Sequence, residues 1–260
     1  MGTVIAMAHC PFHDDRTPSL AIYEDSYHCF GCKKTGKIEP WMSELINGVD
    51  VRDKSQPKLD VTKYSYELSD NVKKFFEDRQ IPEYATINYL VKGKGDVVVL
   101  PCYDVDMQLT GHQKRNVVRK SKNKYITIPV NGVYPDYSWC PLQEHAPLTE
   151  TISVRHRMVV IVESIVDGLF VNRVGFDALA LLGTSPRGSL IPLLASHGLS
   201  CIIFFDPDAI VVASYLNDKF NAHGINSVVL DSDVKPYECD RGTIYRTIQK
   251  LNKELQKNDI

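Results

Sequence analysis

The chain has 260 residues, of which 43% are hydrophobic and 24% charged, so it is expected to be globular, with room for two or three domains. Its net charge of -2 means that the overall electrostatic field of the protein would not attract nucleic acid, so any nucleic-acid binding must come from local basic patches. No segment resembles a secretion signal or a membrane span, because the apolar run from Met1 to Ala8 is too short and lacks a basic start. Seven cysteines, three of them within the first 32 residues, favour metal binding over a disulfide framework. We therefore expect a cytoplasmic protein with no membrane partner.

Two close pairs of potential metal ligands lie near the N-terminus. Cys10 and His13 form the first pair, Cys29 and Cys32 form the second, and fifteen residues separate the pairs. Tetrahedral zinc suits this spacing, because each pair spans one edge of the tetrahedron and the segment between them folds back. A unit this small buries too little core to fold alone, whereas bound zinc can supply on the order of 10 kcal/mol. The pattern predicts a structural Zn²⁺ site.

A hairpin is expected between the two pairs. Residues 19–23 and 26–30 are typical of short strands, with a turn at Glu24 and Asp25. His9 and His28 are neighbouring candidates for the histidine ligand, but the Cys-x-x-His spacing favours His13. The alternative is that cysteines stand near a histidine by chance.

The middle of the chain is predicted to contain a linker, short helices and two strands. Residues 39–47 are a helix candidate, and residues 49–60 are polar and contain proline, which is typical of a flexible linker. Helical spacing covers residues 69–77 and 83–89. Strand patterns cover residues 97–103 and 110–118, on either side of a turn. Residues 129–149 show few regular signals and are expected to connect two subdomains.

The segment from Gly111 to Lys124 is strongly basic. It contains six lysines or arginines and no acidic residue, namely Lys114, Arg115, Arg119, Lys120, Lys122 and Lys124. Such a run can contact the phosphates of a single nucleic-acid strand. A solvated loop is the commoner fate of charge runs, and composition alone slightly favours it.

Acidic residues follow two apolar runs in the last third of the chain. The run Met158–Val162 stops at Glu163, and the run Cys201–Phe205 stops at Asp206 and Asp208. Apolar runs of this kind are typical of strands buried on both faces of a parallel sheet, whose carboxyl ends meet at one edge. Carboxylates gathered there would repel one another unless a divalent cation such as Mg²⁺ or Mn²⁺ joined them. The alternative for each acid is helix capping.

Strand and helix signals alternate through this last third, which predicts a four-stranded, largely parallel sheet with helices on its faces. The expected strands are residues 158–162, 178–182, 201–205 and 227–230, and the expected helices are residues 167–174, 189–196, 209–222 and 242–255. Asp231 and Asp233 end the fourth strand.

Three groups of residues resemble DnaG-like primases, and the zinc motif particularly resembles phage members of that family. His9 to Leu20, with Tyr27 to Cys32 and then Thr35-Gly36, resembles the family's zinc-binding domain. The Gly-x-Gln-x-Arg segment ending at Arg115, followed by Lys124-Tyr125, resembles the family's basic subdomain. Three further segments resemble the motifs of the TOPRIM fold in this family, namely Glu163-Ser-Ile-Val-Asp167, Leu182-Gly-Thr-Ser185 and Phe205-Asp-Pro-Asp208.

The resemblance implies a fold and an activity. The expected organisation is a zinc-binding domain with a zinc ribbon (residues 1–48), a linker (49–60), a basic α+β subdomain of the RNA polymerase core (61–150) and an α/β TOPRIM catalytic domain (151–260). The implied function is a DNA primase of phage or mobile-element origin, acting in the host cytoplasm. It would bind a single-stranded DNA template and join ribonucleoside triphosphates into a short RNA primer by metal-dependent nucleotidyl transfer.

The resemblance also implies roles for particular residues. Glu163, Asp206 and Asp208 would be catalytic and hold Mg²⁺ or Mn²⁺, with Asp233 as a further metal ligand and Asp167 in support. The nucleotide or template phosphates would be bound by basic residues, namely Lys114, Arg115, Arg119, Lys120 and Lys124. The sequence contains no Gly-x-x-x-x-Gly-Lys-[Ser/Thr] phosphate loop, so a replicative helicase would be a separate partner.

Two alternatives to a primase stay open. Ser164 stands where the TOPRIM pattern usually has glycine, and Pro207 to Ile210 replace its commoner Gly-Asp-x-Ala-Gly. These departures suit a catalytically inactive, zinc-dependent DNA-binding or replication-initiation factor. A TOPRIM nuclease would use the same acids to cut DNA, although the zinc pattern and the basic segment argue against it.

Overall fold

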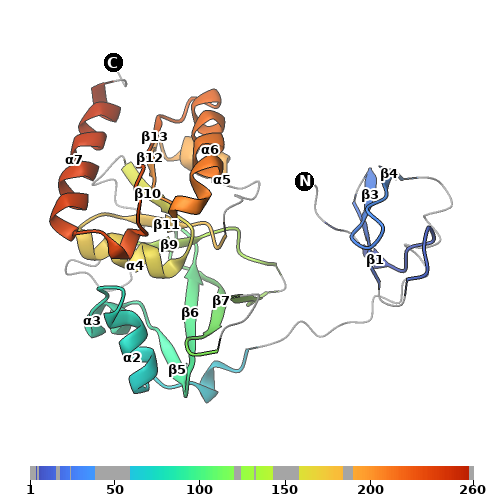
Figure 1. Cartoon of the computed structure of the whole chain (residues 1–260), viewed down its shortest axis with the longest axis horizontal. Coiled ribbons are helices and arrows are strands. Elements are labelled where there is room, and N and C mark those ends of the chain that lie inside the picture. Colours follow the sequence, from blue (N-terminus) through green and yellow to red (C-terminus); the bar gives the residue numbers. More distant parts are fainter. Residues whose placement is uncertain are drawn as a thin grey trace. The chain divides into compact units, whose positions relative to one another are not determined.

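The chain divides into two compact units, Met1–Pro57 and Lys58–Ile260. The structure is a computed structural model, and it describes residue 4 and residues 6–15, 18–23, 25–38, 59–119, 124–131, 133–142, 158–183 and 190–257. The expected helix at 39–47, and all of the expected linker except residues 59 and 60, lie outside the described residues. Figure 1 colours the elements along the sequence.

The first unit is built on a four-stranded antiparallel sheet in the order β1-β2-β3-β4. The strands are β1 Ala6–Ala8, β2 Leu20–Ile22, β3 Ser26–Cys29 and β4 Thr35–Lys37. The predicted hairpin is confirmed as β2 and β3, with Leu20 opposite Cys29 and Ile22 opposite Tyr27. The side chains that these short strands bury form only a small core, so the unit needs a further source of stability.

The second unit begins with a four-stranded antiparallel sheet and short helices. The sheet has the order β5-β6-β7-β8 and the strands are β5 Lys92–Lys94, β6 Val97–Tyr103, β7 Leu109–Asn116 and β8 Ile126–Pro129. The helices are η1 Val61–Lys63, α2 Asp70–Glu77 and α3 Glu83–Asn88. Both predicted helices and both predicted strands are confirmed here. Helix α2 forms because its apolar residues Val72, Phe75 and Phe76 recur at helical spacing and are all buried.

The second sheet of this unit has five strands in the order β13-β12-β10-β11-β9. The strands are β9 Ser138–Cys140, β10 Met158–Val162, β11 Ala178–Ala180, β12 Ser200–Ile203 and β13 Ser227–Val229. The four predicted parallel strands are confirmed. Strand β9 pairs antiparallel with β11 and lies in a stretch that was expected to be a connection. Three residues are too few to show strand periodicity, so β9 is fixed by its pairing partner and not by its own pattern.

Helices cover both faces of the parallel sheet, which explains its near-continuous apolar strands (Figure 1). The helices are α4 Ile165–Val174, α5 Leu190–Ser196, η2 Pro207–Ala209, α6 Ile210–Ala222, η3 Pro236–Glu238 and α7 Arg241–Lys257. Alternate residues of β10 divide between the faces. Val160 and Val162 pack in the core that α4 and α7 share, and Val159 and Ile161 pack in the core of α5 and α6. No described helix is both long and apolar enough to cross a membrane.

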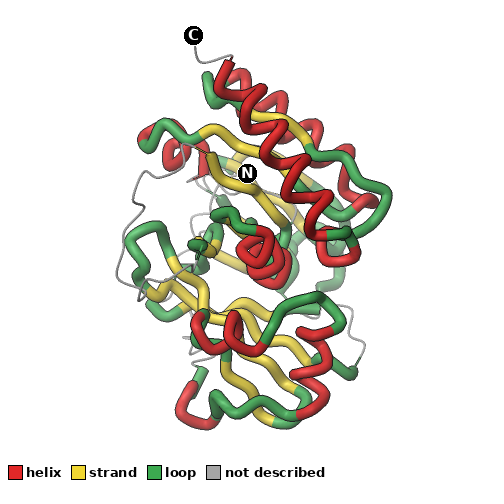
Figure 2. Tube along the Cα trace, turned by 90° about the vertical axis from the view of Figure 1, so that its left-hand side faces the viewer, coloured by secondary structure: helices red, strands yellow, loops and turns green. Residues whose placement is uncertain are grey.

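Buried contacts join the two sheets of the second unit, which Figure 2 shows as separate groups of yellow strands. The Tyr89 hydroxyl, after α3, lies 2.9 Å from the Ser138 hydroxyl of β9, and the Tyr103 amide of β6 donates to the same oxygen at 3.0 Å. One buried cluster contains residues of both sheets, including Leu100 and Val162. The sheets therefore share a core, and that core fixes the positions of the strand ends described below.

Gly168 on α4 provides a test of this packing. A Cβ atom there would lie 2.8 Å from the Cys140 sulfur of β9, whereas a Cβ at Gly242 in α7 would meet nothing closer than 3.5 Å. We expect Gly168→Ala to lower the free energy of unfolding by about 1–2 kcal/mol, because overpacking outweighs the gain in helix propensity. Gly242→Ala, the control, is expected to leave it unchanged or raise it by up to about 1 kcal/mol.

Urea unfolding followed by tryptophan fluorescence measures both variants. The chain has two tryptophans, so a Trp41→Phe background leaves the buried Trp139 of β9 as the reporter. Equal stabilities for the two glycine variants would contradict the close contact between α4 and β9.

Candidate functional site

The first unit brings together four metal-binding side chains. Each of Cys10, His13, Cys29 and Cys32 offers one ligand atom, and these atoms all lie within 4.8 Å of one another. The Cys10 and Cys32 sulfurs are 3.8 Å apart, and the Cys29 sulfur is 3.9 Å from Nδ1 of His13. Two sulfurs bound tetrahedrally to one zinc ion are about 3.8 Å apart, given a Zn–S distance of about 2.3 Å. The cluster therefore fits a structural zinc ion.

Asp15 supports this cluster and was not expected from the sequence. One of its carboxylate oxygens accepts hydrogen bonds from the Cys10 amide at 2.7 Å and the Ser19 hydroxyl at 2.8 Å. The other lies 3.7 Å from Nε2 of His13. The hydrogen bond from the Cys10 amide lowers the pKa of Asp15, and desolvation opposes this shift. The carboxylate of Asp15 therefore stays charged beside the imidazole. Such a partner orients a ligand histidine.

The surroundings shift the pKa values of two of the thiols in opposite directions. Desolvation opposes ionisation of Cys29, but hydrogen bonding with Ser19 and with the Cys32 amide outweighs it and lowers the pKa of Cys29 to about 6. Burial raises the pKa of Cys10 to about 11. His13 is the histidine that joins the cluster, whereas His9 and His28 do not. Gly31 leaves room for its ring, since a Cβ there would lie 2.7 Å from Nε2 of His13.

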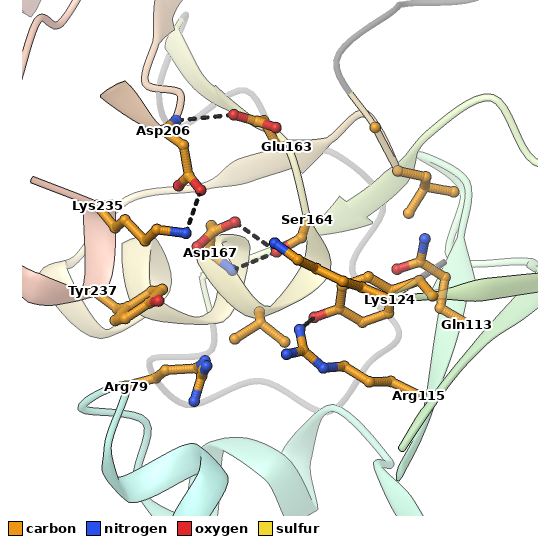
Figure 3. Close-up of a pocket in the computed structure, with 14 residues that line it drawn as sticks. Arg79, Gln113, Arg115, Lys124, Glu163, Ser164, Asp167, Asp206, Lys235 and Tyr237 are labelled. Atoms are coloured by element: carbon orange, nitrogen blue, oxygen red, sulfur yellow. Dashed lines mark hydrogen bonds and ion pairs between the residues drawn. The ribbon is translucent and has the colours of Figure 1, made fainter. Parts of the chain in front are cut away.

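In the second unit, a pocket of about 220 Å³ lies where the antiparallel sheet faces the end of the parallel sheet. Figure 3 shows Glu163, Asp167 and Asp206 on one side, with Lys235 beside Asp206, and Arg79 and Arg115 on the other. The charged side chains that line it are Glu163, Asp167 and Asp206 with Lys235, and Arg79, Arg115 and Lys124.

The acidic wall forms because β10 and β12 are neighbours. The Asp206 amide, beyond the end of β12, donates to Oε1 of Glu163, at the end of β10, over 2.9 Å. The predicted convergence of these two acids is therefore present. Asp206 stands at the N-cap position of η2, yet its side chain makes no capping hydrogen bond. Its carboxylate is held instead by the Lys235 ammonium, 2.8 Å from Oδ2.

Asp167 lies beneath this wall in the first turn of α4. The Ser164 hydroxyl donates to Asp167 Oδ2 at 2.5 Å and accepts from the Asp167 amide at 3.3 Å, so Ser164 caps the helix. Burial raises the pKa of Asp167 to about 6. Desolvation also raises the pKa of Glu163, and the charges of Asp206 and Asp208 add to it. The acids are thus crowded and partly desolvated, which disfavours their charged forms unless a cation lies beside them.

Two of the predicted acidic ligands do not line the pocket. Asp208 is exposed one residue beyond Pro207, and Asp233 is exposed in the loop after β13. Lys235, two residues after Asp233, lines the pocket in that loop. Sequence reasoning did not single out Lys235, because a lysine next to proline carries no signal of its own.

The basic wall comes mainly from β7 and the loop before β8. Arg115 donates to the Tyr125 hydroxyl at 3.0 Å and stacks 4.8 Å from the Phe75 ring. Arg79, after α2, stacks over the same ring at 3.9 Å and was missed by the sequence analysis. These contacts place both guanidinium groups over the Phe75 ring while they line the pocket.

The other predicted basic residues are placed differently. Lys114 does not line the pocket, and its ammonium lies 5.8 Å from the Tyr64 ring, because neighbouring residues of a strand face opposite sides. Arg119 is exposed beyond the end of β7, and Lys120 lies outside the described residues. Gln113, two residues before Arg115, lines the pocket, and its buried Oε1 has no hydrogen-bond partner. That orphaned acceptor suits a polar ligand.

Comparison with known proteins agrees with this description. Residues 5–74 match the family model of the CHC2 zinc finger. A DNA primase of Helicobacter pylori is 21% identical over 273 aligned positions, which cover 78% of this chain and 47% of that protein. The chain spans about half the length of the curated relatives that it matches along most of its own length.

Two solved structures share the fold. The zinc-binding and RNA polymerase domains of the Aquifex aeolicus primase align with a TM-score of 0.58 at 17% identity, covering 95% of this chain and 78% of that one. The catalytic domain of a DnaG primase bound to single-stranded DNA aligns with a TM-score of 0.53 at 14% identity, covering 71% of each chain. The chain therefore has the zinc ribbon and mixed α/β fold of primase domains, and it resembles DnaG-like primases with a zinc domain.

The zinc cluster yields the first test of this site. We expect the purified chain to contain one zinc ion, and Cys29→Ser to lose most of it, because three ligands hold zinc more weakly than four. Metal content is measured by mass spectrometry after gel filtration. Cys239→Ser, which changes a cysteine of the second unit, is the control and should retain its zinc. Full zinc occupancy in Cys29→Ser would contradict the assignment.

The buried carboxyl of Asp167 predicts how stability depends on pH. Its pKa is about 6 in the folded state and 3.8 when unperturbed. Below about pH 4 both states are protonated and the group contributes nothing. Between about pH 4 and 6 the unfolded state releases the proton first, so stability falls as pH rises, by on the order of 3 kcal/mol in total.

Asp167→Asn removes this cost and should therefore be more stable than the parent at pH 7.5, but not at pH 4. Urea unfolding of the Trp41→Phe background at both pH values, without added Mg²⁺ or Mn²⁺, measures the difference. Asp218→Asn, at an exposed site on α6, is the control and should show no pH-dependent effect. The idea fails if Asp167→Asn and the parent differ equally at both pH values.

Proposed function

We propose that this chain, which resembles DnaG-like primases, is a DNA primase that synthesises short RNA primers on single-stranded DNA. The proposal rests on one observation: a single pocket holds Glu163 and Asp206 on one wall and Arg79 and Arg115 on the other. That arrangement suits a metal-bound triphosphate. The combination of this pocket with a Cys/His zinc cluster on the same chain favours a primase over a nuclease that would use the same acids.

The acidic wall is proposed to hold the catalytic metal. Mg²⁺ or Mn²⁺ bound there would lower the charge on the triphosphate and polarise the reacting phosphorus. Glu163 and Asp206 are the proposed direct ligands, with Asp208 reaching from the exposed turn and Asp167 supporting them from below. Asp233 remains a predicted ligand from the loop after β13. Hard carboxylate oxygens in this setting suit these ions.

The basic wall is proposed to hold the nucleotide and template. Arg79, Arg115 and Lys124 would bind phosphate oxygens, since their positive charges face the pocket. The free Oε1 of Gln113 would accept a hydrogen bond from a hydroxyl or amino group of the nucleotide. An attacking 3′-hydroxyl aligned between the walls would displace pyrophosphate. Lys114, Arg119 and Lys120 remain predicted contacts to the template outside the pocket.

Domain roles follow from the same proposal. Residues 1–48 would be the zinc-binding domain that helps select the start site, and residues 49–60 its linker. Residues 61–150 would be the basic subdomain, and residues 151–260 a TOPRIM domain. The solved DnaG domain bound to single-stranded DNA supports a single-stranded template. A separate replicative helicase is the proposed partner, and the cytoplasm, that of a bacterial host for a phage protein, is the proposed compartment.

One observation favours a second candidate function. Asp206 is already paired with the Lys235 ammonium, which suits a zinc-dependent DNA-binding or replication-initiation factor that lacks catalysis. Incubation with single-stranded DNA, labelled ribonucleotides and Mg²⁺ or Mn²⁺ separates the possibilities. RNA products support the primase, cut DNA supports a nuclease, and binding without either supports the inactive factor.

Asp206→Asn is the decisive variant in that assay. We expect it to reduce primer synthesis at least about 100-fold, because it removes a metal ligand while preserving side-chain volume. Asp218→Asn makes the same chemical change on the exposed face of α6 and should retain normal synthesis. Primer synthesis that survives Asp206→Asn would show that the acidic wall is not the catalytic centre.

A further inference from the structure

Among the described residues that line the pocket, Lys235 is the cation that forms an ion pair with an acid of the same pocket. Its ammonium lies 2.8 Å from Oδ2 of Asp206, whereas Arg79 and Arg115 lie on the opposite wall (Figure 3). Between described residues, no other ion pair involves an acid of this pocket.

Hydrogen bonds fix the backbone of Lys235, whereas its side chain is long and partly exposed. The Lys235 carbonyl accepts from the Glu238 amide at 2.9 Å, and the Lys235 amide donates to Oε2 of Glu238 at 3.3 Å. Gln80 holds the same loop by donating to the Tyr237 carbonyl at 2.7 Å. The Lys235 side chain itself is 36% exposed, and it has four rotatable bonds. The ammonium can therefore leave Asp206 without any change in the loop.

A divalent cation and this ammonium cannot share Asp206 at low cost. An ion bound to Oδ2 at about 2.1 Å would lie no more than about 5 Å from the ammonium, given the 2.8 Å ion pair. The two positive groups would repel strongly at that separation in a partly desolvated pocket. Either the ammonium moves away or the metal binds weakly.

We propose that Lys235 is a tethered cation that competes with the divalent metal for Asp206 and swings away when the metal binds. In the absence of metal it offsets the mutual repulsion of Glu163 and Asp206 and keeps the acidic wall assembled. Lys235 thereby sets the affinity of the site, so that metal binds only where its concentration is high enough to displace the ammonium. This inference rests on the proposed function, because it takes Asp206 as a metal ligand.

The test measures Mn²⁺ binding directly, by the loss of the free-ion signal in electron paramagnetic resonance, on the zinc-loaded full chain. Lys235→Gln keeps a polar side chain, one bond shorter than lysine, and removes its charge, and we expect it to bind Mn²⁺ about tenfold more tightly than the parent. Lys235→Arg keeps the charge and should bind like the parent. Lys250→Gln is the control, because it makes the same charge change at an exposed pair with Glu254 on α7. It should leave the affinity unchanged.

Each outcome has one meaning. Unchanged or weaker Mn²⁺ binding in Lys235→Gln, with binding still abolished by Asp206→Asn, overturns the competition but leaves the proposed metal site intact. A gain in Lys250→Gln equal to that in Lys235→Gln also overturns it, because a general charge effect would then explain the result. If neither the parent nor Lys235→Gln shows binding that Asp206→Asn removes, the proposed metal site fails together with this inference.

Discussion

The second unit depends on one constraint, which is that β10 and β12 are neighbours and end at the same edge of a parallel sheet. The Asp206 amide donates to Glu163 Oε1, so two residues 43 positions apart in sequence meet there. Strand β10 lies inside the sheet with helices packed on both faces, so its end cannot shift without disturbing both cores. The stability of those cores holds together acids that would otherwise repel one another.

The opposite charge of the two pocket walls has the same origin in packing. The basic wall belongs to the antiparallel sheet and the acidic wall to the parallel sheet, and the two sheets share buried contacts at Tyr89 and Ser138. The distance between the walls is therefore set by buried contacts away from the pocket, both this hydrogen bond and the shared apolar cluster. A charged ligand finds its binding groups already placed, which lowers the ordering cost of binding.

The zinc unit follows a different physical principle. Its sheet buries few side chains, so its order depends on four ligand atoms that lie where a tetrahedral ion would bind them. Asp15 joins the cluster to the start of the hairpin by accepting from Cys10 and Ser19. The second unit, in contrast, is stabilised by a large core. Metal in the first unit supports structure, whereas the proposed metal of the second unit would support chemistry.

The sequence by itself determined the features that depend on local pattern. Unbroken apolar runs predicted β10 and β12, the alternation of strand and helix signals predicted the other two parallel strands and the helices around them, and ligand spacing predicted the Cys/His cluster. Only the tertiary structure decided which side chains enter the pocket. It placed Arg79 and Lys235 there, turned Lys114 away, left Asp233 exposed, and added β9 to the sheet. The physical reason is that loop paths, strand register and edge pairing depend on contacts between distant segments, which leave no periodic trace in the sequence.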